Sequence, residues 1–152
     1  MSDKLSPAQK RSLRNASRPA ITSAFGGLKK QFAGSRWLPK SNAYRTATVA
    51  QIKDHLDRKT PTSLVSKQAA DYIAASVPLH ALDGWSFLGR AVDASARGDA
   101  DVARHLAYYA ELRAAVSLLA HEGMGVFNRQ HLIVDSTRNV TMLPGVHATH
   151  VV

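Results

Sequence analysis

The stretch that decides the fold class is ADVARHLAYYAELRAAVSLLAHE, residues 100–122. Its large apolar residues recur at steps of three and four, which is the period of one face of an α-helix. They are Val102, Leu106, Tyr109, Leu112, Val116 and Leu119. Asp99 or Asp101 suits the N-terminus of this helix, and Gly123 suits its C-terminal cap. The pattern predicts a helix of roughly 33 Å, with this stripe buried, at the centre of a mainly α-helical bundle.

Weaker helical signals lie upstream of this stretch. Thr48 and Gln51 have the spacing of a capping box and predict a helix that runs to about Lys59. A second helix is predicted from Ser63. Pro78 is expected to interrupt it, because proline lacks the N–H that an interior helical residue donates.

A third upstream helix is predicted to start at Asp83, which would cap it. Trp85, Leu88 and Val92 share one face of this helix at i, i+3 and i+7. We expect Trp85, together with Phe87, to belong to the hydrophobic core.

The period changes after Gly125. Residues 131–134 (HLIV) and 140–143 (VTML) are rich in β-forming side chains and are separated by STRN, which predicts a terminal β-hairpin. An isolated hairpin is marginal in water, so this one must pack on the helices or on another chain. Because the chain stops at Val152 without a polar tail, we expect a fragment of a longer protein or an end that a partner buries.

The net charge of +9 is concentrated at one end of the chain. Residues 1–59 hold 13 Lys/Arg and 3 Asp/Glu, whereas residues 60–152 hold 7 Lys/Arg and 8 Asp/Glu. A local excess of this kind steers a protein to nucleic acid, to an anionic membrane surface or to an acidic protein partner. Solubility alone is the simpler interpretation.

Residues 1–45 are predicted to form a basic, partly flexible arm, and residues 46–152 a helical domain with the terminal hairpin. Ser6-Pro7 can open a short helix in the arm. Trp37 is the best candidate for stacking on a base or anchoring in a partner, although its segment could also pack on its own domain. The candidate nucleic-acid-binding residues are Lys10, Arg11, Arg14, Arg18, Lys29, Lys30, Arg36, Trp37, Lys40 and Arg45.

Several classes of function are excluded or disfavoured by what the sequence lacks. The absence of cysteine excludes disulfide scaffolds, thiolate metal sites and cysteine nucleophiles. No apolar run approaches the ~18 residues that span a bilayer, and the first residues are too polar for a secretory signal, so we expect a cytoplasmic protein. No nucleotide-binding motif is present. His147 and His150 lack a carboxylate beside them, and neither a metal nor a cofactor is expected.

Polar residues gather around the end of the 100–122 helix. Their simplest role is a structural network of salt bridges. The functional alternative is acid–base chemistry on a phosphodiester, in which His121 or His131 moves a proton and Arg113 stabilises the phosphate charge. This chemistry would need no metal.

The stretch RHLAYYAELRAAVSLLAHEG (residues 104–123), followed by FNRQH (127–131), resembles the central helix of HEPN-type helical proteins, especially the YaaC-like branch. The resemblance implies a four-helix bundle, frequent dimerisation, and a place in bacterial defence or toxin systems. Active members of this family are metal-independent RNases with an arginine followed a few residues later by a histidine. Seven residues separate Arg113 from His121 here, and one separates Arg129 from His131. This departure favours an inactive binding or assembly module.

Taken together, these features predict a non-catalytic helical subunit of a bacterial defence or mobile-element complex. It would bind a protein partner or a second copy of itself, and DNA or RNA through its basic N-terminal third. One alternative is a metal-independent HEPN-like RNase that uses Arg113, His121 and His131. Another is a toxin–antitoxin partner protein.

Overall fold

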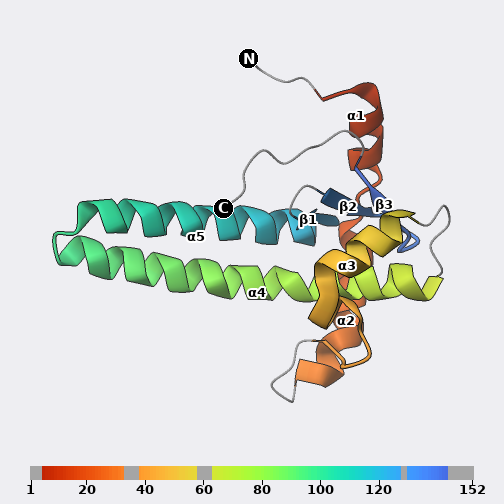
Figure 1. The fold of residues 1–152 in the computed structure, drawn as a ribbon, viewed down its shortest axis with the longest axis horizontal. Helices are drawn as coiled ribbons and strands as arrows, with labels where there is room; N and C mark the ends of the chain where they lie inside the picture. The colour runs from red at the N-terminus through yellow and green to blue at the C-terminus, as the bar shows by residue number, and fades with distance from the viewer. Residues whose placement is uncertain (1–4, 33–37, 58–62, 128–129, 144–152) are drawn as a thin grey trace.

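The computed structural model describes residues 5–32, 38–57, 63–127 and 130–143. Within these ranges the protein is mainly α-helical with a small C-terminal sheet, as predicted (Figure 1). The helices are α1 (Pro7–Arg14), α2 (Arg18–Phe32), α3 (Tyr44–Asp57), α4 (Ser63–Ala96) and α5 (Ala100–His121). The strands are β1 (Met124–Phe127), β2 (Gln130–Val134) and β3 (Val140–Met142).

The longest helices, α4 and α5, form an antiparallel hairpin that extends well beyond the rest of the molecule (Figure 1). Gly98 makes the tight turn with φ +81°, and the Asp99 side chain caps α5 by accepting a hydrogen bond from the Val102 N–H at 3.3 Å. Gly123 ends α5 with φ +96°. The predicted helix, its N-cap and its terminal glycine are therefore confirmed.

The predicted break at Pro78 and the predicted helix start at Asp83 are wrong. Both residues lie inside α4, which continues for 34 residues. A proline removes one backbone hydrogen bond, but α5 packs along α4 at this level, and the Ser117 hydroxyl donates to the Val77 carbonyl at 2.8 Å. Tertiary packing outweighs the local preference here.

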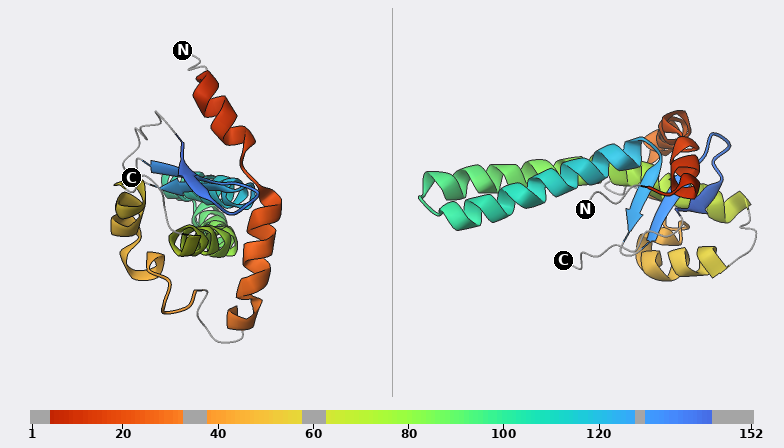
Figure 2. Two further views of the ribbon diagram at one scale, coloured as in Figure 1. Left: turned by 90° about the vertical axis from the view of Figure 1, so that its right-hand side faces the viewer. Right: turned by 90° about the horizontal axis from the view of Figure 1, so that it is seen from above.

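The hydrophobic core lies at one end of the hairpin. Seen along the hairpin, α2 and α3 flank α4 on opposite sides and the sheet covers it from above (Figure 2). The fully buried side chains at the centre of this core include Ile21 of α2, Tyr44 and Ile52 of α3, Ile73 of α4 and Leu132 of β2. Residues 18–28, assigned to a basic arm from the sequence, thus contribute to the same core as α4, so that α2 packs on its own domain.

The distal part of the hairpin has little around it, and this overturns two expectations about burial. The predicted buried stripe of α5 is half-buried or exposed, with Val102 46% and Leu112 37% accessible, whereas Ala110 is buried. Trp85, expected in the core, is 72% exposed. Two helices alone cover only the strip along which they touch, so their other apolar residues face solvent.

The C-terminal sheet is an antiparallel meander in the order β1-β2-β3. The predicted hairpin is confirmed as the β2–β3 pair, in which Ile133 lies opposite Thr141. The additional strand β1 pairs with β2 and was not predicted. A hydrogen bond from the Ser17 N–H to the Val134 carbonyl (2.9 Å) fixes the start of α2 to this sheet.

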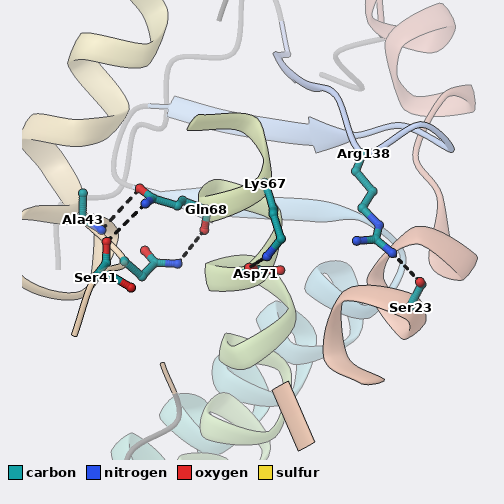
Figure 3. A network of polar contacts seen from close by, with 8 residues as sticks. Ser23, Ser41, Ala43, Lys67, Gln68, Asp71 and Arg138 are labelled. Atoms are coloured by element: carbon teal, nitrogen blue, oxygen red, sulfur yellow. Dashed lines mark hydrogen bonds and ion pairs between the residues drawn. The ribbon is translucent and has the colours of Figure 1, made fainter. Parts of the chain in front are cut away.

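Polar contacts join the elements of the core (Figure 3). The Gln68 side chain of α4 donates to the Ser41 carbonyl at 3.2 Å, and the Asn42 side chain donates to the Gln68 carbonyl at 3.0 Å. These contacts hold the segment before α3 on α4. Arg138, in the β2–β3 turn, donates to the Ser23 hydroxyl of α2, so the sheet and α2 are linked a second time.

Candidate nucleic-acid interface and hairpin groove

Most of the basic N-terminal third contains no acidic residue that would offset its charge. Between residues 5 and 53 the sequence holds no Asp or Glu. This stretch supplies α1, α2 and most of α3. Its positive charges are Lys10, Arg11, Arg14, Arg18, Lys29, Lys30, Arg36, Lys40, Arg45 and Lys53.

Helix α1 presents the clearest group of these cations. The Ser6 side chain accepts from the Gln9 N–H while the Gln9 side chain accepts from the Ser6 N–H, and Pro7 occupies the first turn, so the helix starts as its sequence predicts. No residue of α1 is buried, and the helix projects from the body of the molecule (Figure 1). Lys10, Arg11 and Arg14 are exposed, and none of the described carboxylates pairs with them.

The other candidate binding residues are placed differently. Arg18 forms an ion pair with Glu122 at 2.6 Å and so ties α2 to the end of α5, although its side chain remains 59% exposed. Lys40 is exposed and Arg45 is half-buried. Two further candidates, Lys29 and Lys30, lie on α2 but their side chains are not described, and Arg36 and Trp37 lie outside the described residues.

Arg113 lies in a polar cluster on the side of the hairpin. Its Nη1 is 3.3 Å from His80 Nδ1, and its Nε is 4.0 Å from an Asp83 carboxylate oxygen. That Nε is buried without a hydrogen bond. Burial, and then the charge of Arg113, lower the pKa of His80 below its ordinary value. The neutral imidazole can therefore accept a hydrogen bond from the guanidinium.

The two histidines of the predicted catalytic set lie elsewhere. His121 ends α5, 3.9 Å from the Glu122 carboxylate. It is eight residues, or roughly 12 Å of helix, beyond Arg113. His131 is on β2 and shares a sheet face with Ile133, and burial lowers its pKa. No hydrogen bond or ion pair among the described residues connects Arg113, His121 and His131. The contacts of Arg113 and Glu122 are those of the structural network considered as the simpler alternative.

A groove along one face of the hairpin is a feature that sequence reasoning missed. It encloses about 660 Å³ and is mostly apolar. Gly84 and Ala110 form its floor where the helices touch, and a Cβ on Gly84 would lie 3.3 Å from the Ala110 carbonyl oxygen. Trp85 on α4 and Leu118 on α5 also line it and are 72% and 62% exposed. The feature of the sequence that could have indicated this groove is the spacing of small residues, three or four apart, on both helices.

The fold and these surfaces define a small α-helical protein with a basic N-terminal surface and a projecting apolar hairpin. Within the described residues no helix is long and apolar enough to cross a membrane. No protein-family model, no curated protein and no solved structure matches this chain. The resemblance to HEPN-type proteins therefore stays a prediction.

Proposed function

We propose that this protein is a non-catalytic subunit that binds nucleic acid through its basic N-terminal third, with α1 as the principal contact. The observation that carries the proposal is the placement of Lys10, Arg11 and Arg14. They lie on a capped, projecting helix, exposed and without a described carboxylate partner. Cations that are already paired would lose that pairing on binding phosphate, whereas these three have no pairing to lose among the described carboxylates.

The expected mode of binding is contact with the phosphate backbone. Each Lys or Arg that neutralises a phosphate releases condensed counterions, which favours association in low salt without reading the base sequence. Lys40 and Lys53 are also exposed and add to the positive charge of the N-terminal third. We therefore expect weak sequence preference and strong salt dependence.

The non-catalytic part of the proposal rests on the lack of any described hydrogen bond or ion pair that joins Arg113, His121 and His131. In the RNase alternative, the histidine that moves the proton and the arginine that stabilises the charge must reach the same phosphodiester, and Arg113 lies roughly 12 Å along α5 from His121. Arg113 instead contacts His80 and Asp83 on the hairpin. The context of a bacterial defence or mobile-element complex derives from the HEPN resemblance alone.

The test compares two triple variants that each remove three positive charges. Lys10→Ala/Arg11→Ala/Arg14→Ala changes α1, and Arg90→Ala/Arg97→Ala/Arg104→Ala changes exposed arginines of the hairpin. Binding to labelled single-stranded RNA, single-stranded DNA and duplex DNA is measured by gel shift with EDTA at about 50 mM salt. The α1 variant should bind about 10²–10³-fold more weakly, since each lost phosphate contact costs roughly tenfold at this salt. The hairpin variant should bind nearly as wild type does.

Equal weakening in both variants would mean that net charge alone drives association, and the interface on α1 would be wrong. Shortened RNA in the EDTA lanes would instead favour the RNase alternative. Substitution is preferred to deletion of the N-terminal third because Ile21 and Leu28 of α2 belong to the shared core.

A further inference from the structure

The groove-bearing face of the hairpin combines small and large apolar residues in a regular way. Gly84 and Ala110 are buried along the line where α4 and α5 touch, and Ala81 and Ala107 beside them are half-buried. Trp85 and Leu118 stand on the outer side of this line, one on each helix, and are the most exposed large residues of the groove. The face thus has a recessed floor between two apolar ridges.

We infer that this face is covered by a second copy of the same chain, so that two hairpins form a four-helix bundle. The inference concerns a surface other than the proposed nucleic-acid interface and does not depend on it. Trp85 and Leu118 of one copy would occupy the recess over Gly84 and Ala110 of the other.

The shape of the face favours a second copy over an unrelated partner. An interface with two-fold symmetry uses the same patch on both chains, so the patch must carry both the projections and the recesses. This face does so, because the ridge residues Trp85 and Leu118 border a floor of glycine and alanine. When the two-fold axis lies in the plane of the interface, each helix packs against a helix of the partner that runs in the opposite direction. This is the arrangement of up-down bundles.

The available area agrees with a stable dimer. The part of the hairpin from Val77 to Ala96 is about 30 Å long, and two packed helices are about 20 Å wide. One face therefore presents on the order of 600 Å² in projection. Because a ridged surface has more accessible area than its projection, this approaches the ~800 Å² that one partner contributes to a standard interface. Trp85 alone is 72% exposed, and buried aromatic residues dominate interface energetics.

The charged residues of this face also favour a second copy of the chain as the molecule that covers it. Among the residues that the structure describes, Glu111 and His121 are the ionisable ones that line the groove, and no Lys or Arg does. Charged residues are depleted at the centre of protein interfaces. A groove that neither lysine nor arginine lines is a weak site for phosphates, so nucleic acid is a poor occupant here.

The test is the molar mass in solution, measured by light scattering on a sizing column and by sedimentation equilibrium. The full chain has a mass of 16.4 kDa, and we expect twice that value at about 100 μM. Leu118→Glu places a carboxylate in the recess and should give a monomer. Trp85→Ala adds no charge and removes a mostly exposed side chain, so the fold should survive, and the dimer dissociation constant should rise about 30-fold or more.

The matched control is Leu112→Glu, which places the same charge on the same helix at a position outside the groove, where Leu112 is 37% exposed. It should remain dimeric, and circular dichroism should show full helix content in all three variants. A monomeric wild type at about 100 μM would overturn the inference. So would a dimer that Trp85→Ala leaves unchanged, because the groove would then not be the interface.

Discussion

At the scale of single residues, two glycines with positive φ lie in different surroundings. Gly98 turns the chain between α4 and α5 with open space around it. Gly123 turns the chain from α5 into β1, and there a Cβ would lie 2.7 Å from the Ser17 nitrogen and 3.1 Å from the Val134 carbonyl oxygen. Those two groups form the hydrogen bond that fixes α2 to the sheet.

Gly123→Ala should therefore destabilise the protein more than Gly98→Ala does. Both changes place an L-residue in the left-handed region, at about 1–2 kcal/mol. Only Gly123→Ala also forces apart the Ser17–Val134 pair, which adds at least ~1 kcal/mol. Urea denaturation would measure both free energies of unfolding, and equal losses would show that the contact at Gly123 relaxes without cost.

Local signals explain which single residues could be predicted from the sequence. The helix start at Ser6, the Asp99 N-cap and the Gly123 terminus were predicted because each satisfies backbone groups a few residues away. The exposure of Trp85 could not be predicted. Periodicity shows that residues share a face, but only the fold determines whether anything covers that face.

At the scale of elements, the α4–α5 hairpin depends on a close approach at Gly84. A Cβ there would be 3.3 Å from the Ala110 carbonyl oxygen and 3.5 Å from the Arg113 Cβ. Gly89, five residues further along α4, has nothing within 4 Å of its Cβ position. The two glycines therefore form a matched pair on one helix.

Gly84→Leu should push α5 away from α4 and cost about 1–3 kcal/mol or more in the free energy of unfolding, as overpacking does. Gly89→Leu should be neutral or stabilise by up to ~1 kcal/mol, since leucine favours helix over glycine. Thermal melts followed by circular dichroism would compare the two. A Gly84→Leu protein as stable as wild type would show that the helices separate easily and that the hairpin is loosely packed.

The elements differ in how well the sequence predicts them. The period of α5 and the β-rich runs of β2 and β3 are strong local patterns, and both predictions are confirmed. Continuity of α4 through Pro78 depends on packing against α5, and β1 is a four-residue strand with Gly125 inside it. Neither the continuity of α4 nor the strand β1 can be predicted from secondary-structure propensity, because the contacts that decide them join residues distant in sequence.

At the scale of the whole molecule, the excess positive charge and the apolar groove lie on different elements. The acid-free basic stretch supplies α1, α2 and most of α3 around the core, whereas the exposed apolar residues Trp85, Leu118 and Val92 lie on the hairpin. The charge asymmetry was apparent in the sequence, and so was the role of α1 as a candidate for binding nucleic acid. The groove was not, because it needs both helices side by side. In a dimer formed through the hairpins, each particle would carry two basic surfaces.

The most direct test of the central claim, that the N-terminal third binds nucleic acid through phosphate contacts, is a salt titration of the wild-type protein. Fluorescence anisotropy with a labelled duplex would give the association constant from about 50 to 200 mM salt. Neutralisation of four to six phosphates predicts a slope of roughly −4 to −5 in log K against log salt, and the Lys10/Arg11/Arg14 triple variant should lose about 3 from that slope. A flat titration, or a slope that the variant leaves unchanged, would contradict the account.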